Sequence, residues 1–292
     1  MVNIYKKDKI FDWVVIIIMG VFSVVLLLPL LHVLASSFSS PEAVNLGKVG
    51  LFPVNFSLVS YQKVFANKLI MRGYLNTIIY TVIGTIIQLI LQFTAAYALS
   101  RKDLKYKRFW NVFFVIPMFI GGGMIPTYLV VKSLGMINTI WAMIIPGCVS
   151  LFNIIIIRTY MTSMIPYELQ EAAMIDGASN FRIFIQIVVP LSKPIIAVMT
   201  LYAIVGYWNA YFNSLLYLTD DSLFPLQRVL QTMLIANDSG QIGGGVGNVE
   251  SELLAETLKY ATIIVSTAPI LLLYPFFQRF FEKGLMVGGL KG

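Results

Sequence analysis

Six long stretches of the chain contain no Asp, Glu, Lys or Arg, and more polar segments separate them. Each has about 20 residues or more, the length that a helix needs to cross the hydrocarbon core of a bilayer. None shows the alternating ten-residue pattern of membrane barrel strands. The pattern predicts an all-α, polytopic membrane protein with six transmembrane helices in a single domain, residues 1–292. The spans are expected at about residues 13–35, 74–99, 109–131, 133–157, 194–219 and 260–278.

The composition excludes a soluble globular enzyme. Of the 292 residues, 58% are hydrophobic and 12% are charged, against about 25% charged residues in a soluble domain. The net charge of +7 is also typical of nucleic-acid-binding proteins, but the basic residues lie mainly between the neutral stretches. Two thirds of the 21 Lys and Arg residues fall on the side that holds both termini. Because cytoplasmic loops are enriched in basic residues, we expect a multi-pass protein of the cell membrane with both termini in the cytoplasm.

Few residues are suited to catalysis. The single histidine, His32, could handle protons near the end of the first span, or it could form a hydrogen bond at a helix interface. The single cysteine, Cys148, can form neither an internal disulfide nor a cysteine-based metal site, which indicates a packing role. The chain has no nucleotide P-loop, zinc-protease motif or serine-hydrolase motif. The sequence thus predicts no catalytic residue, no metal and no cofactor in this chain.

The connection between the fourth and fifth spans, at about residues 163–193, predicts a helical hairpin. Pro166 suits a first helical turn, and Gly177 can take the left-handed conformation that ends a helix. Ser179 or Asn180 can cap a second helix, which we expect to end at Pro190. On these grounds alone the hairpin could also lie with its apolar side on the membrane surface.

Specific residues of this hairpin favour another role. Glu171-Ala172-Ala173 and Asp176-Gly177-Ala178, followed by Phe184, Ile187, Pro190 and Pro194, resemble at matching spacing the E-A-A-x-x-D-G-A loop of binding-protein-dependent ABC importer permeases. The position before the fifth of six spans also fits that family. The resemblance implies the type I ABC importer permease fold.

Other segments resemble the carbohydrate-uptake, maltose-type branch of this family, and specifically its smaller permease. They are Asn76-Thr77, the run 206–209, the run 224–226 and the end of the chain at 283–292. Within the branch, the sequence is most similar to permeases for aldouronate, alginate or pectin oligosaccharides.

The resemblance implies a set of partners. The hairpin would be the coupling helix that docks on an ATPase subunit, through Glu171, Ala172, Ala173, Asp176, Gly177 and Ala178. The small residues would permit close approach, and the two carboxylates could hold the hairpin by capping or pairing. The partners are a homologous second permease, two ATP-binding subunits that hold ATP-Mg, and an extracellular or periplasmic solute-binding protein. The loop residues Gly243, Gly244, Gly245 and Gly247 would contact the binding protein, and the tail residues Gly288, Gly289 and Lys291 would contact the ATPase.

A transport path can be argued from the side chains of two spans. In the second span, Thr77, Thr81, Thr85, Gln88 and Gln92 form one polar helical face, which must point into the bundle. In the fifth span, Tyr207, Trp208, Asn209, Tyr211 and Asn213 could stack on sugar rings and bind their hydroxyl groups. Polar residues also join transmembrane helices, and aromatic residues also form interfacial belts. In some family members only the partner permease touches the substrate.

The sequence therefore predicts a permease subunit that imports a sugar, expected to be an oligosaccharide, by ATP-driven alternating access. One alternative is a permease of the same fold for a non-sugar solute. A charged solute would need compensating charge in the path, which the neutral spans lack and the partner permease could supply. A membrane channel and an intramembrane enzyme are the remaining alternatives, and neither requires the E-A-A hairpin.

Overall fold

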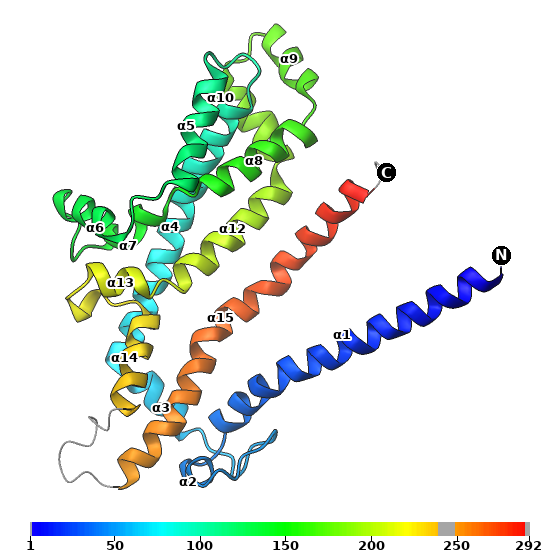
Figure 1. Ribbon diagram of the computed structural model, residues 1–292. Coiled ribbons are helices and arrows are strands. Elements are labelled where there is room, and N and C mark those ends of the chain that lie inside the picture. The colour runs from blue at the N-terminus through cyan, green and yellow to red at the C-terminus, as the bar shows by residue number, and fades with distance from the viewer. Residues whose placement is uncertain (1, 239–248, 290–292) are drawn as a thin grey trace. The chain divides into compact units, whose positions relative to one another are not determined.

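The computed structural model describes residues 2–238 and 249–289, and every regular element in this part of the chain is helical (Figure 1). Internal contacts group the chain into two compact units. One unit comprises Met1–Met71 and Leu230–Ala268, and the other comprises Arg72–Val229 and Pro269–Gly292. The second unit contains the predicted hairpin and the polar face of the second span.

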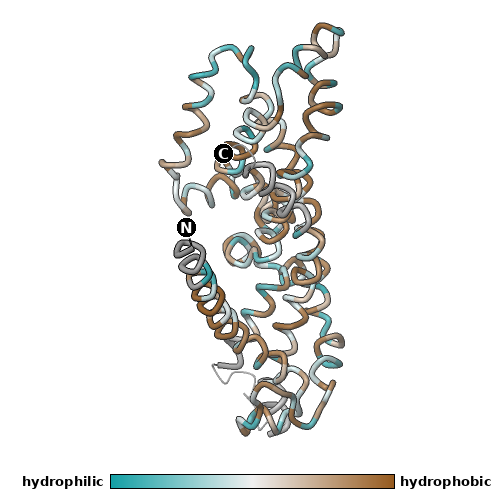
Figure 2. The backbone as a smooth tube through the Cα atoms, turned by 90° about the vertical axis from the view of Figure 1, so that its right-hand side faces the viewer, coloured by the Kyte–Doolittle hydropathy of each residue, from teal (hydrophilic) through white to brown (hydrophobic). Residues whose placement is uncertain are grey.

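Three helices contain an uninterrupted segment long and apolar enough to cross a membrane: α1 (Val2–Ser37), α4 (Lys68–Ser100) and α15 (Val249–Gly289). The segments are Phe11–Ser37, Lys68–Ser100 and Thr257–Gln278, with mean hydropathies of 3.1, 1.8 and 1.7. Hydrophobic residues follow much of the helical length of the chain (Figure 2). These helices confirm the first, second and sixth predicted spans as helices, although each extends beyond its predicted ends.

The third and fourth predicted spans are bent pairs of helices, and the helix of the fifth is bent against the hairpin arm that precedes it. α5 (Lys107–Phe119) and α6 (Met124–Ser133) meet at 113°. α7 (Ile140–Ile144) continues as the 3-10 turn η1 (Ile145–Gly147) and meets α8 (Leu151–Met164) at 51°. The segment Asn180–Leu191 meets α12 (Lys193–Trp208) at 82°. The described chain therefore reaches six spans only when each bent pair counts as one.

The break in the third span follows from its sequence. α5 ends at Phe119 and α6 begins at Met124, so the helix stops over the three glycines at 121–123. Gly123 has a φ of +82°, which side-chain-bearing residues rarely adopt. The fifth span also differs from its expected length, because α12 ends at Trp208 and a separate helix, α13 (Phe212–Tyr217), follows.

The 163–193 hairpin consists of α9 (Tyr167–Ile175), α10 (Asn180–Ile183), the π-helical turn η2 (Phe184–Val188) and α11 (Val189–Leu191). Its second arm contributes Ile183 and Val188 to the main apolar cluster of the unit, together with Ala96 of α4 and Ile157 of α8. The arm ends at Leu191, one residue beyond the predicted end at Pro190. A π-helical turn just before Pro190 changes the backbone bonding there, so the proline is accommodated.

In the first unit, α2 (Pro41–Asn45) and α3 (Val59–Ala66) follow α1. A small core of Ala35, Ala43 and Val49 holds this segment. His32 Nδ1 lies 3.0 Å from the carbonyl oxygen of Gly50, to which it can only donate. This hydrogen bond supports the interface interpretation of His32.

Candidate functional site

A six-residue backbone motif forms the corner of the hairpin. The amide of Gly177 donates to the carbonyl of Met174 at 3.0 Å, and the amide of Ala178 donates to that of Ala173 at 2.9 Å. This pair of bonds is the Schellman motif, which requires a left-handed residue after the helix. Gly177 supplies it, with a φ of +76°. The prediction that Gly177 ends the first helix is confirmed.

Ser179 caps the second arm. Its hydroxyl accepts a hydrogen bond from the Arg182 amide at 3.3 Å, which resolves the choice between Ser179 and Asn180. The two arms of the hairpin are therefore fixed by local bonds on either side of one exposed corner.

The acidic residues of the hairpin point to solvent. Glu171 and Asp176 are exposed, and within residues 2–238 and 249–289 neither carboxylate has an ion pair or a side-chain hydrogen bond. The expectation that they hold the hairpin by capping or pairing was wrong, because backbone bonds at the corner perform that task. Both charges are thus available to a partner.

The hairpin also exposes large apolar side chains. Ile175 and Phe181, on either side of Gly177, are 87% and 72% exposed. Beside them, Ala173, Asp176 and Ala178 line a hollow of about 260 Å³ with residues of the second arm. Exposed Ala172 continues this surface along α9. Large apolar side chains at a corner of this kind indicate a surface that another protein or a membrane covers.

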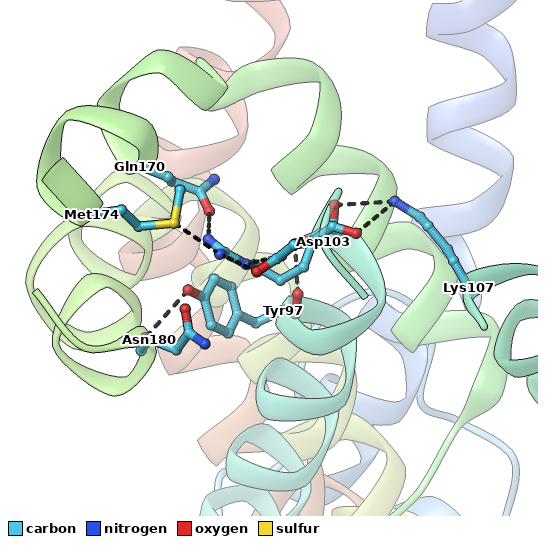
Figure 3. A network of polar contacts seen from close by, with 8 residues as sticks. Tyr97, Asp103, Lys107, Gln170, Met174 and Asn180 are labelled. Carbon is cyan, nitrogen blue, oxygen red and sulfur yellow. Dashed lines mark hydrogen bonds and ion pairs between the residues drawn. The ribbon is translucent and has the colours of Figure 1, made fainter. Parts of the chain in front are cut away.

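A buried guanidinium group joins α9 to the end of α4. Arg101 is 5% exposed, and its Nη1 donates to Gln170 Oε1 at 3.1 Å. Its Nη2 donates to Met174 Sδ at 3.2 Å. Figure 3 shows Gln170 and Met174 of the hairpin directed at this group. Arg101 was not predicted from the sequence, because a basic residue after a span is also what membrane orientation requires.

Asp103 fixes the other edge of the guanidinium group. Nε and Nη2 of Arg101 donate to the two carboxylate oxygens, each at 2.8 Å. These bonds lower the pKa of Asp103, and the same pair raises the pKa of Arg101. Since two parallel bonds fix the plane of the group, its remaining donors point at α9.

The predicted polar face of α4 is buried. Thr77, Thr81, Thr85, Gln88 and Gln92 are each at most 6% exposed. Among the described residues, the hydroxyls of Thr81 and Thr85 and the amide of Gln92 have no hydrogen-bond partner. By contrast, Thr94 on the exposed side donates to Ile90 O at 2.7 Å. The face therefore points into the protein, as predicted, and keeps unused polar atoms there.

Two separate cavities contain six of the ten residues of the predicted path. The larger, of about 530 Å³, is lined by Thr81, Thr85 and Trp208, with Tyr74 and seven apolar residues. The smaller, of about 250 Å³, is lined by Gln88, Tyr207 and Asn213. The other four, Thr77, Gln92, Asn209 and Tyr211, line neither cavity.

Tyr207 packs across a glycine of α4. A Cβ at Gly84 would lie 2.5 Å from Cζ of Tyr207, so only glycine leaves room for the ring. The Tyr207 hydroxyl donates to the carbonyl of Ile144 at 3.1 Å, where the fourth span is broken. These contacts give Tyr207 a structural role beside its place in the smaller cavity.

The opposite end of α4 holds the segment before α14 (Leu226–Asp238), which includes the 3-10 turn η3 (Asp221–Leu223). Asn76 Nδ2 donates to the carbonyls of Ser222 at 2.8 Å and Phe224 at 3.0 Å. Tyr80 donates to Leu223 O at 2.7 Å, and the Leu226 amide donates to Thr77 Oγ1 at 2.8 Å. α4 is thus bonded to other elements at both ends.

Part of the predicted contact surface lies outside the described residues: Gly243, Gly244, Gly245, Gly247 and Lys291. Gly288 and Gly289 form the end of α15.

The comparisons with known proteins agree on one family. Residues 92–287 match the family described as binding-protein-dependent transport system inner membrane component. The chain is 39% identical over 291 residues to the polygalacturonan/rhamnogalacturonan transport system permease protein YtcP of Bacillus subtilis (strain 168), covering 98% of this chain and 100% of that protein. It is 28% identical to the arabinooligosaccharides transport system permease protein AraQ of Halalkalibacterium halodurans, covering 98% and 99%.

A solved structure is similar over nearly the whole chain. It is a bacterial ABC transporter involved in the import of the acidic polysaccharide alginate. The TM-score is 0.85 at 32% sequence identity, and the match covers 94% of this chain and 98% of that one.

Proposed function

This chain belongs to the family of binding-protein-dependent transport system inner membrane components, and on that premise we propose that it imports an oligosaccharide as one permease subunit of an ABC transporter. It is a multi-pass membrane protein with the type I permease fold, and it is not itself an enzyme. The observation that carries the coupling role is the hairpin corner, which exposes Ile175 and Phe181 beside Gly177.

The proposed assembly contains a second homologous permease, two ATPase subunits that bind ATP-Mg, and a solute-binding protein. The hairpin docks on an ATPase subunit in the cytoplasm, where both termini also lie. The exposed apolar pair supplies contact area, and the unpaired Glu171 and Asp176 supply charge. Closure of the ATPase pair then moves the hairpin and, with it, the spans.

The proposed substrate contact of this subunit is the larger cavity. Thr81 and Thr85 line it, their hydroxyls buried and without a partner among the described residues, and Trp208 and Tyr74 offer aromatic rings. Rings stack on sugar faces, and hydroxyls bind sugar hydroxyls. The relatives named above include a permease for polygalacturonan and a structure for alginate import, and both solutes are acidic. Since neither cavity is lined by a basic residue, counter-charge for such a sugar would come from the second permease.

The test is sugar-stimulated ATP hydrolysis by the complete assembly in lipid nanodiscs. The binding protein is added with matched neutral and uronate-containing oligosaccharides. Stimulation by one class supports oligosaccharide import and identifies the substrate. ATPase activity that is indifferent to every sugar overturns the sugar assignment, and absence of any associated ATPase overturns the coupling role.

Docking is tested separately with the double variant Ile175→Ser, Phe181→Ser. We expect less ATPase subunit to copurify with it, because the exposed apolar area is lost. The control is Tyr106→Asn, which removes an 82% exposed aromatic side chain from the neighbouring loop and keeps a residue that tolerates its φ of +55°. Normal copurification of the double variant would favour the membrane-surface interpretation of the hairpin.

A further inference from the structure

α9 is held in place by a polar contact. Gln170 is the only buried residue of α9, with 5% of its surface exposed. Its side chain accepts the hydrogen bond from Arg101. Met174, one turn further along the same face, accepts the second bond. The guanidinium group of Arg101 is therefore the polar tie of α9, beside the packing of Ala173 and Met174 on the apolar cluster.

The second arm of the hairpin is held differently. Ile183 and Val188 are 0% and 1% exposed within the apolar cluster that includes residues of α4 and α8. The Tyr97 hydroxyl of α4 also donates to the carbonyl of Asn180 at 3.2 Å. This arm is held by buried contacts that do not involve Arg101, whereas α9 reaches the same cluster only through the partly buried Ala173 and Met174. Loss of the guanidinium group would therefore loosen α9 more than the second arm.

The loop after α4 and the first residue of α5 keep Arg101 itself in place. Asp103 binds one edge of the guanidinium group, and Lys107 Nζ donates to the backbone carbonyl of Arg101 at 2.8 Å. Figure 3 shows Asp103, Lys107 and Tyr97 gathered around this point. The group is thus fixed to the α4 side and bonded across to α9.

α4 is continuous between its two sets of contacts. It contains no proline and runs as one helix from Lys68 to Ser100. At a rise of 1.5 Å per residue, about 37 Å separates Asn76 from Arg101. The far end is bonded to the segment 222–226 through Asn76, Thr77 and Tyr80. A displacement of α4 at the hairpin end should therefore also displace the segment 222–226 at the other end.

We propose that Arg101 is a positioning residue that joins α9 to α4, so that movement of the docked hairpin is delivered along α4 to the segment 222–226. The proposal rests on the proposed function, since the movement comes from a docked ATPase. It assigns the transmission to one guanidinium group and one helix.

The experiment compares Arg101→Gln with the unaltered chain in the complete assembly in nanodiscs. ATP hydrolysis and sugar uptake are measured together, as sugar transported per ATP hydrolysed. We expect this ratio to fall by about tenfold or more, as for the loss of one charged hydrogen bond, with ATPase association unchanged. The control is Lys105→Gln, which removes one positive charge from an exposed residue of the same loop. This variant should keep the normal ratio of sugar transported to ATP hydrolysed.

Variants of the acceptor separate positioning from folding. Gln170→Ala leaves the Arg101–Asp103 pair intact and should also lower the ratio, whereas Gln170→Glu keeps an acceptor and should preserve it. Arg101→Lys should not restore it, because a single ammonium group cannot bind Asp103 and α9 in the same fork geometry. The double variant Arg101→Gln, Gln170→Ala should be no worse than Arg101→Gln alone.

Amide hydrogen exchange reports the far end of α4. In the unaltered assembly we expect ATP binding to change exchange in the segment 222–226, and Arg101→Gln should abolish that change. A normal transport ratio in Arg101→Gln overturns the proposal; if that variant fails to assemble, a normal ratio in Gln170→Ala overturns it. Failure of the unaltered chain to bind any ATPase would instead overturn the proposed function.

Discussion

Single residues fix the geometry of the hairpin corner. Gly177 adopts a φ of +76°, and a Cβ there would meet no atom within 4 Å. The constraint at this position is therefore the backbone conformation and not space. Gly84 is the opposite case, because its φ is ordinary and its constraint is the ring of Tyr207.

Gly177→Val should uncouple ATP hydrolysis from transport. A β-branched residue in the left-handed region costs about 1–2 kcal/mol, so the Schellman corner should open. Gly177→Asn is the matched variant, since asparagine tolerates this region. Transport per ATP is the measurement, and equal ratios in the two variants would show that the φ of residue 177 does not matter.

Gly84→Ala should destabilise the protein through overpacking. The new methyl group would displace the Tyr207 ring and break its bond to Ile144, at a cost of about 1–3 kcal/mol. Gly206→Ala serves as the control, because no atom lies within 4 Å of its Cβ position. Thermal unfolding of the two purified variants gives the comparison, and an equal midpoint in both would contradict the packing argument.

The Asp103 carboxylate should give the hairpin a limited pH dependence. Its pKa is lowered, chiefly by the hydrogen bonds from Arg101, so its stabilisation is complete above the unfolded pKa and is lost as pH falls through the folded one. The stability difference from Asp103→Asn should be constant near neutral pH and shrink below about pH 4. Because the Asp103 side chain is 56% exposed, we expect a difference below about 1 kcal/mol. Thermal unfolding of both proteins across pH tests the sign.

At the scale of elements, features that depend on neighbouring residues could be predicted from the sequence, and contacts between distant residues could not. The corner at Gly177 and the cap at Ser179 depend on residues within one turn, so the sequence alone identified the corner and narrowed the cap to Ser179 or Asn180. The bond from Arg101 to Gln170 crosses 69 residues, and nothing local distinguishes Arg101 from other basic residues beside a span. The break in the third span falls on a local signal, the glycines at 121–123, and was predictable. The bends of the other two spans were missed, because apolar length predicts a crossing but helix breaks also depend on tertiary partners, as the Tyr207 bond to Ile144 illustrates.

The element most dependent on α4 outside the hairpin is the segment 222–226. Asn76→Ala would remove two hydrogen bonds to its carbonyls, each worth about 1 kcal/mol. Amide exchange in 222–226 should become faster, while exchange in α9 under the same conditions without ATP should not change. Thr94→Ala provides a control on the same helix, because its hydroxyl bonds only within α4. Unchanged exchange in the Asn76 variant would mean that other contacts hold the segment.

At the scale of the whole molecule, orientation can be tested directly. Cys148 is the only cysteine and is buried, so Cys148→Ala gives a background for single labels. Lys48→Cys and Lys105→Cys place thiols at exposed positions in connections that we assign to opposite sides. A membrane-impermeant maleimide should label position 48 in intact cells and position 105 only after permeabilisation. The reverse pattern would invert the assignment of both termini.

The first helix has a consequence for how the protein is made. The segment Phe11–Ser37 has a mean hydropathy of 3.1 and no charged residue between positions 13 and 35, so lipid can solvate it without a protein neighbour. α4, with Gln88 and Gln92 on its inner face, is costly in lipid until neighbours cover that face. Those neighbours, α8 and α12, leave the ribosome later. α1 can therefore enter the bilayer alone during synthesis, whereas α4 reaches its final environment only when α12 has been translated.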